Sequence, residues 1–156
     1  MTRKIRIMAV ASAGGHWVQL MRLRPAWEGL EVTYVTTDPG LRQTLEEAGK
    51  ATPDFRVITE ANRWHKRKLI RQLAELTFIM ARVRPDAVIT TGAAPGYFAL
   101  RLGRLFGART VWIDSMANAE DLSLSGQQAR RHADLWLTQW EHLAKPDGPE
   151  FLGSVL

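Results

Sequence analysis

The chain has 156 residues, 46% of them hydrophobic and 24% charged, which are ordinary values for one globular domain with its own core. It contains no cysteine, which excludes disulfides and thiolate metal sites and is compatible with a reducing cytoplasm. The first residues lack the long apolar stretch of a signal peptide, and no apolar run approaches the roughly 18 residues that span a membrane. We therefore expect a soluble or peripheral protein.

Strand-like and helix-like segments alternate along the chain. Apolar and β-branched runs predict strands at residues 4–11, 31–36, 55–58, 87–90, 109–114 and 135–139. Periodicity and capping residues predict helices at residues 16–24, 41–48, 66–83, 96–106 and 127–132. Such alternation is typical of an α/β fold with a single Rossmann-like doubly wound parallel sheet. We assign this domain to residues 1–143, and residues 144–156 to a C-terminal tail that docks on the domain itself or on a partner.

Two glycine-rich turns follow predicted strands. Ser12-Ala13-Gly14-Gly15-His16 comes after the first strand, and Thr90-Thr91-Gly92-Ala93-Ala94-Pro95-Gly96 follows the fourth. In open parallel sheets, ligands bind beyond the carboxyl ends of the strands, where glycine lets backbone amides approach an anion such as phosphate. The glycine spacing does not fit the dinucleotide fingerprint, and neither turn carries the Gly-Lys-Ser/Thr of a P-loop. The turns predict a phosphate-bearing ligand, unless they serve only as tight turns.

Two titratable side chains are candidate catalytic groups. His16 begins a helix beside the first turn, where it acts as a base or binds phosphate, or is an ordinary surface histidine. Asp114 ends a strand at the edge where both turns emerge, where it accepts a proton or holds a sugar hydroxyl, or caps the turn that follows. The four histidines lack metal-ligand spacing and no Asp-x-Asp triplet occurs, so we expect no metal and no cofactor.

The net charge of +5 is concentrated between Arg63 and Arg84, where seven basic residues accompany one acid, so the rest of the chain is close to neutral. Basic residues beside tryptophan suit an anionic membrane surface, with the ring at headgroup depth. The residues expected to contact the membrane are Arg63, Trp64, Lys66, Arg67, Lys68 and Arg71. A solvated helix face is the simpler alternative. No recognised nucleic-acid motif accompanies the charge, so no nucleic-acid partner is expected.

Several motifs together resemble a known family. They are Ser12–His16, Thr90–Gly96, Ile113-Asp114-Ser115, Leu122–Gly126, Ala133-Asp134-Leu135 and Gln139-Trp140-Glu141, and they span almost the whole chain. The chain resembles the acceptor-side subunits of two-protein GT-B glycosyltransferases. That family includes asparagine-linked glycosylation protein 14 and bacterial PssD-type exopolysaccharide proteins. The chain is also similar to the N-terminal half of MurG.

The resemblance implies one half of a GT-B enzyme, with a separate donor-binding subunit that holds the UDP-sugar. This half would meet the membrane and a saccharide acceptor linked to a polyprenyl diphosphate, with His16 as the candidate base. The two turns would hold the acceptor diphosphate through Ser12, Gly14, Gly15, Thr91, Gly92, Pro95 and Gly96. The family's usual Ile-Glu-Ser is Ile113-Asp114-Ser115 here, and Asp114 is carried over as the second catalytic candidate.

We therefore expect a subunit of an inverting, metal-independent hexosyltransferase. It moves a sugar, N-acetylglucosamine or another, from a UDP-sugar to a polyprenyl-diphosphate-linked acceptor in surface polysaccharide assembly. The expected location is the inner face of the cell membrane, with attachment through the basic segment or partners, since the N-terminal membrane helix of eukaryotic members is not found here. The alternatives are a non-catalytic scaffold that recruits a transferase, and a stand-alone nucleotide-binding enzyme such as a small reductase or epimerase.

Overall fold

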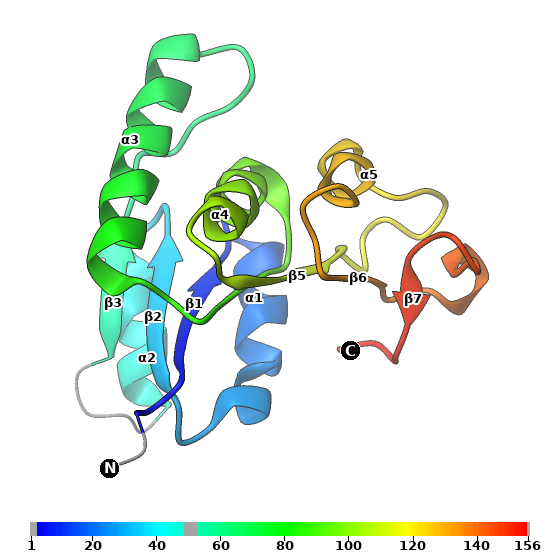
Figure 1. Cartoon of the computed structure of the whole chain (residues 1–156), viewed down its shortest axis with the longest axis horizontal. Coiled ribbons are helices and arrows are strands. Elements are labelled where there is room, and N and C mark those ends of the chain that lie inside the picture. Colours follow the sequence, from blue (N-terminus) through cyan, green and yellow to red (C-terminus); the bar gives the residue numbers. More distant parts are fainter. Residues whose placement is uncertain (1–2, 49–52, 156) are drawn as a thin grey trace.

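Parallel strands form one sheet in the order β3-β2-β1-β4-β5-β6-β7 in the computed structural model, which describes residues 3–48 and 53–155 (Figure 1). The strands are β1 (Arg6–Val10), β2 (Glu31–Thr36), β3 (Asp54–Val57), β4 (Ala87–Thr90), β5 (Arg109–Ile113), β6 (Leu135–Thr138) and β7 (Glu150–Phe151). Every neighbouring pair is parallel. The expected Rossmann-like doubly wound sheet is confirmed.

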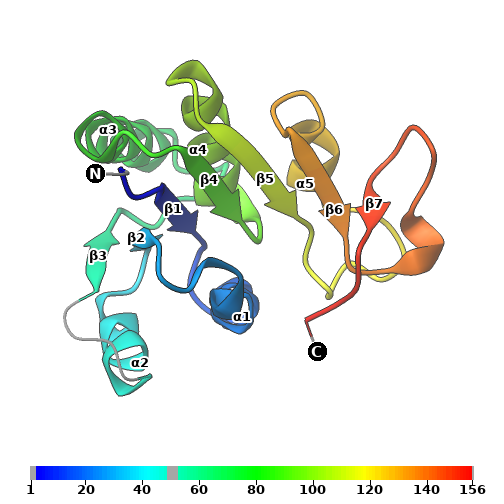
Figure 2. The same cartoon turned by 60° about the horizontal axis from the view of Figure 1, so that its bottom comes forward.

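Helices cover both faces of the sheet (Figure 2). One face carries α1 (Gly15–Arg22) and α2 (Arg42–Glu47), with the short 3-10 helices η1 (Arg24–Trp27) and η2 (Pro39–Leu41). The other carries α3 (Lys66–Val83), α4 (Ala93–Leu105) and α5 (Leu124–Ala129), and η3 (Glu141–Leu143) connects β6 to β7. Among the described residues, none of the helices combines the length and the apolar character needed to cross a bilayer.

The core has a layer on each side of the sheet. Side chains alternate along β1, so Met8 and Val10 pack towards Leu76 and Met80 of α3, while Ile7 and Ala9 pack towards Trp17 of α1. Because both faces are covered, β1 is apolar at successive positions instead of alternating with polar residues. This explains why the first strand is so clear in the sequence.

Most predicted elements lie where the patterns place them, and helix 66–83 has the predicted bounds. Helix α4 begins at Ala93, three residues before the predicted start, so the end of the second glycine-rich motif is helical. Helix α5 begins at Leu124 because the Ser123 hydroxyl caps it by accepting from the Gly126 N–H at 2.8 Å. The prediction placed this helix three residues too late.

The segment 144–156, expected as a tail, adds a strand that the sequence analysis did not predict. Strand β7 pairs with β6 through Leu137 opposite Glu150 and Thr138 opposite Phe151. Further on, the Val155 N–H donates to Gln139 Oε1 at 3.0 Å, and Arg22 donates to the Val155 carbonyl at 2.9 Å. This segment therefore packs on its own domain, and its docking on a partner stays a prediction.

Candidate functional site

The order of the strands reverses at the β1–β4 pair. From β1 the sheet continues to β2 and β3 on one side, and from β4 it continues to β5, β6 and β7 on the other. The crevice beyond the carboxyl ends of such a pair is where open α/β sheets bind ligands. Residues 11–14 leave β1 there and residues 91–92 leave β4, so the two predicted turns meet at this crevice.

His16 and Thr91 join the two turns through a reciprocal pair of hydrogen bonds. The Thr91 hydroxyl donates to the His16 carbonyl at 2.6 Å, and His16 Nδ1 lies 2.9 Å from the Thr91 carbonyl oxygen. A carbonyl oxygen only accepts, so Nδ1 must carry the proton of this bond. In the neutral ring, Nε2 then holds the free lone pair. The half-buried imidazole is thus fixed in the tautomer that presents a base at Nε2.

The first turn leaves backbone open towards the crevice. Gly14 has φ +84°, a left-handed conformation that favours glycine, and no other atom lies within 4 Å of where a Cβ would stand on Gly14 or Gly15. No side chain caps the start of α1, so its first N–H groups have no side-chain partner. The Ala13 N–H donates to Thr37 at 3.3 Å, which anchors the turn to the end of β2. Ser12 is half-buried beside it. This turn has the features expected of an anion site.

Three residues of the second turn have structural roles in the fold, and their contact with a diphosphate stays a prediction. The Gly92 N–H donates to Thr90 Oγ1 at 3.1 Å, so it is already used. Pro95 is buried in the first turn of α4 and has no N–H to donate. A Cβ on Gly96 would lie 2.0 Å from Thr90 Oγ1, so this glycine is needed to pack α4 on β4. Of the second motif, Thr91 contributes most directly to the crevice, through His16.

Gly92 leaves the space that His16 occupies. Its φ is +125°, and an added Cβ would lie 3.0 Å from His16 Cε1 and 3.1 Å from Nδ1. Gly92→Ala is therefore expected to strain the backbone, displace the imidazole, cost about 1–3 kcal/mol of stability and lower any activity that depends on His16. Denaturant unfolding and initial rates measure the two effects.

Gly107→Ala is the matched control for that substitution. Gly107 also has a positive φ, +80°, but nothing lies within 4 Å of its Cβ position. We expect it to lose stability through backbone strain while the rate per folded molecule is unchanged. Equal loss of rate in both variants would show that Gly92 does not act through His16.

Asp114 is an internal hydrogen-bond acceptor and not an accessible base. Its side chain is only 1% exposed. Oδ1 accepts from Trp112 Nε1 at 3.1 Å and from the Ser123 hydroxyl at 2.7 Å. Oδ2 accepts from the Ser123 N–H at 3.0 Å and from Asn118 Nδ2 at 3.2 Å. A carboxylate with these bonds holds the loop between β5 and α5, which is the capping alternative, and it has little access to a substrate proton.

Asp114→Asn is expected to destabilise the fold by about 1–3 kcal/mol, because the new amide places a donor against groups that also donate. Urea unfolding of the variant measures this loss. Asp121→Asn, a change to an exposed acid in the same loop, is the control and should be neutral. A full-stability Asp114→Asn protein with no transferase activity would restore the catalytic assignment.

A buried glutamine pair, which the sequence analysis did not identify as functional, positions α1. Gln19 lies one turn after His16 and donates to Ser115 Oγ at 3.0 Å. Its Oε1 accepts from the Met116 N–H at 3.1 Å and from Gln139 Nε2 at 2.6 Å. Two features of the sequence could have indicated this pair. They are a polar residue between the apolar Trp17 and Leu20, and the Gln139-Trp140-Glu141 motif. The pair braces the helix that carries His16 against the loop after β5.

The basic segment lies at the same edge as the crevice. Helix α3 runs antiparallel to the strands, so its start is at their carboxyl ends, and Figure 1 shows it extending beyond the sheet. The predicted contact residues Arg63, Trp64, Lys66, Arg67, Lys68 and Arg71 are all exposed. Trp64 is 76% exposed, with the Arg63 guanidinium 4.9 Å from its ring centre. Ile70, at 68%, and Phe78, at 66%, are exposed apolar side chains on the same helix.

Glu75 fixes the loop that leads into this basic segment. Its carboxylate accepts from the Thr59 N–H at 2.6 Å, the Thr59 hydroxyl at 2.9 Å and Arg71 Nε at 3.0 Å. Burial raises the pKa of Glu75, but these hydrogen bonds and the Arg71 charge together bring it below its ordinary value. The segment is therefore held in place beside the crevice.

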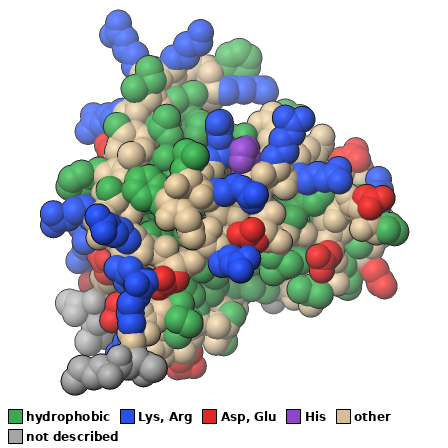
Figure 3. All heavy atoms as spheres, viewed as in Figure 1, with side chains coloured by type: hydrophobic (Ala, Val, Ile, Leu, Met, Phe, Trp, Pro, Cys, Tyr) green, Lys and Arg blue, Asp and Glu red, His purple; other side chains and the backbone are tan. Residues whose placement is uncertain are grey.

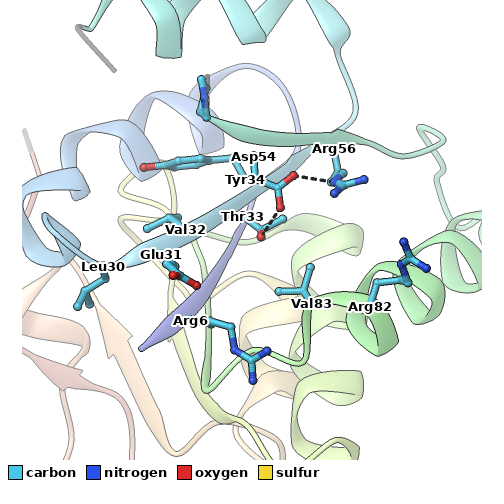
Figure 4. A pocket seen from close by; sticks show the side chains of 11 residues that line it. Arg6, Leu30, Glu31, Val32, Thr33, Tyr34, Asp54, Arg56, Arg82 and Val83 are labelled. Atoms are coloured by element: carbon cyan, nitrogen blue, oxygen red, sulfur yellow. Dashed lines mark hydrogen bonds and ion pairs between the residues drawn. The ribbon is translucent and has the colours of Figure 1, made fainter. Parts of the chain in front are cut away.

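A large hollow at the opposite edge of the sheet, of about 590 Å³, is not part of this site (Figure 4). Arg6, Glu31 and Asp54 line it at the amino ends of β1, β2 and β3. Its charges are partly paired, since Asp54 accepts from Thr33 and from Arg56, each at 2.8 Å. Across residues 3–48 and 53–155, no group of three or more His, Asp or Glu side chains is placed to hold a metal ion.

The fold is that of one half of a GT-B enzyme. The structure is similar to MurG from Acinetobacter baumannii, with a TM-score of 0.75 and 15% identity, over 97% of this chain and 46% of MurG. It is also similar to a putative UDP-N-acetylglucosamine 2-epimerase from Listeria monocytogenes, with a TM-score of 0.68 and 16% identity, over 88% of this chain and 40% of the epimerase. The chain thus spans less than half of these proteins, and at such identities the likeness shows the fold alone.

The sequence itself is similar to a particular transferase subunit. It is 28% identical to the mouse (Mus musculus) UDP-N-acetylglucosamine transferase subunit ALG14, over 97% of this chain and 83% of the mouse protein. No protein-family model matches the chain. Together with the fold, this match confirms the resemblance to ALG14-like subunits of GT-B glycosyltransferases.

Proposed function

We propose that this chain is the acceptor-binding subunit of a hexosyltransferase. Its donor is a UDP-sugar, with N-acetylglucosamine first among the candidates, and its acceptor is a saccharide on polyprenyl diphosphate in surface polysaccharide assembly. The similarity to a subunit of a UDP-N-acetylglucosamine transferase supports the class of reaction. The observation that carries the proposal is His16, fixed by Thr91 at the crevice where both turns meet.

In the proposed mechanism, His16 Nε2 takes the proton from the attacking hydroxyl of the acceptor. The hydroxyl oxygen forms a bond to the anomeric carbon of the donor while the bond from that carbon to the UDP oxygen breaks, so UDP leaves with the electron pair and the configuration inverts. Ser12, Gly14 and Gly15 hold the acceptor diphosphate and orient the hydroxyl towards the donor. General-base assistance of this kind contributes about 10²- to 10⁴-fold in rate.

The donor half of the cleft is proposed to lie on a partner subunit. MurG is more than twice as long as the part that this chain matches, whereas the mouse relative, called a subunit, is matched over 83% of its length. The partner would face the carboxyl edge of the sheet, where the first turn is open. Acceptor and donor would then meet between the two subunits.

The start of α3 is proposed to rest on the anionic inner face of the cell membrane. Lys66, Arg67 and Lys68 supply positive charge, and Trp64 and Ile70 supply exposed apolar surface. Because this segment and the crevice share one edge, a lipid-linked acceptor would reach the crevice with its chain still in the membrane.

Reconstitution with a donor-binding partner subunit tests the proposal. We expect the pair to transfer labelled sugar from UDP-N-acetylglucosamine or another UDP-sugar to membrane lipid acceptors, and each protein alone to be inactive. Activity of the partner alone would favour a recruiting scaffold. Epimerisation of UDP-N-acetylglucosamine by the isolated chain would favour the stand-alone enzyme, because this domain is similar to 40% of an epimerase chain.

A further inference from the structure

A second hollow lies between α4 and α5, away from the crevice. It measures about 560 Å³, and its lining consists of Tyr97, Arg101, Gln127, Gln128, Arg131 and His132. Figure 3 shows Lys and Arg side chains gathered on the helical face that includes α4 and α5. Arg101 stands nine residues after Gly92, or roughly 13 Å along the helix axis. We call it the α4/α5 hollow.

Every side chain that lines the α4/α5 hollow can donate a hydrogen bond, and no acid lines it. The nearby Asp134 is 3.8 Å from Arg104, outside the hollow. In the described parts of the chain, neither Arg101 nor Arg131 forms an ion pair within 4.0 Å. Arg101 lies 5.9 Å from the centre of the Tyr97 ring, a cation–π position that holds the guanidinium beside the hollow.

The pKa of His132 is affected by the positive charges around the α4/α5 hollow. Burial lowers the pKa of His132, and the positive charges of Arg101, Arg104 and Arg131 lower it further. The Tyr97 and His132 rings are in a T-shaped arrangement, with their centres 5.9 Å apart. Of these three charges, Arg104 is paired with Asp134, whereas no ion pair within 4.0 Å offsets Arg101 or Arg131 in the described residues.

We propose that the α4/α5 hollow is a binding site for a phosphate group. Arg101 and Arg131 contact its oxygens, since guanidinium groups match the geometry of phosphate, and the amide of Gln128 donates to a remaining oxygen, whereas Gln127 Nε2 already donates to the Leu122 carbonyl at 3.0 Å. The phosphate belongs to a soluble compound or to a lipid headgroup. The site is separate from the crevice and does not depend on the proposed transferase activity.

Titration of the full-length protein with inorganic pyrophosphate, followed by NMR, tests the soluble source. We expect saturable shifts at Arg131 and His132, and a rise in the pKa of His132 because the bound anion offsets the arginine charges. Arg131→Gln should weaken binding about tenfold. Arg109→Gln removes the same charge from an exposed position at the start of β5 and should leave binding unchanged.

Binding to vesicles tests the lipid source. Vesicles of phosphatidylcholine with phosphatidylglycerol are compared with phosphatidylcholine alone, using the same two variants. Loss of vesicle binding in Arg131→Gln, but not in Arg109→Gln, supports the site with a headgroup as ligand even where pyrophosphate does not bind. Equal effects of the two variants in both arms would overturn the proposal. So would pyrophosphate shifts confined to Gly14–His16 together with vesicle binding that Arg131→Gln leaves unchanged.

Discussion

His16→Ala is expected to lower kcat of the reconstituted transferase about 10²- to 10⁴-fold, with little change in KM. In the proposed mechanism, Nε2 acts only as the acceptor hydroxyl attacks, whereas the backbone of the first turn would hold the diphosphate. Initial rates at saturating UDP-sugar and lipid-linked acceptor measure the effect. Unchanged turnover would remove His16 from the mechanism.

His16→Asn separates the base from the structural role of the side chain. The asparagine amide is able to donate to the Thr91 carbonyl in place of Nδ1, which lies 2.9 Å from that oxygen, but it has no basic nitrogen at the position of Nε2. We expect this variant to be as slow as His16→Ala while matching the wild type in thermal stability. Recovery of the wild-type rate in His16→Asn would mean that His16 only positions the two turns.

The convergence of the two turns could be predicted from sequence because it follows from topology. Alternating strands and helices imply a parallel sheet, and all carboxyl ends of a parallel sheet share one edge. The bond between His16 and Thr91 could not be predicted, because it depends on the close approach of residues 75 positions apart. The sequence therefore indicated which edge of the sheet carries the site, whereas the tautomer of His16 follows only from the folded structure.

The second glycine-rich motif was predicted as a turn, with the helix that follows it beginning only at Gly96. Proline is tolerated in the first turn of a helix, where its missing N–H has no partner to lose, so α4 begins before Pro95. Gly96 requires the side chain of Thr90 as its neighbour, and that contact exists only after α4 folds onto β4. These structural roles of Pro95 and Gly96 could not be predicted from the sequence, and the contact of both residues with a diphosphate stays a prediction.

The burial of single side chains and the local charge of the surface were the properties least predictable from the sequence. Asp114 is surrounded by donors that include Ser123 and Asn118, so its exposure depends on how the loop folds. The charge of the chain outside residues 63–84 is close to zero in sum, which conceals the local excess at Arg101 and Arg131. A net charge is a sum over the whole segment, so it does not show where the fold places basic residues close together.

Reversing the charge of Lys66, Arg67 and Lys68 to glutamate is expected to weaken binding to anionic vesicles at least about 100-fold. Each basic residue near such a surface contributes about 1 kcal/mol, and each substitution also adds repulsion. Cosedimentation with phosphatidylglycerol-containing vesicles at low salt measures the loss. Undiminished binding would refute the membrane role of this segment.

The control for this experiment is a second triple variant, which has the same net charge as the Lys66, Arg67 and Lys68 variant but keeps α3 unchanged. Arg42, Arg109 and Lys145 are exposed and lie outside α3, and their reversal to glutamate should weaken vesicle binding much less. Trp64→Ala and Ile70→Ser leave the charge unchanged and remove apolar surface, so they should weaken binding even at high salt, where charge is screened. If both triple variants lose binding equally, attraction depends on total charge, and α3 does not orient the crevice towards the membrane.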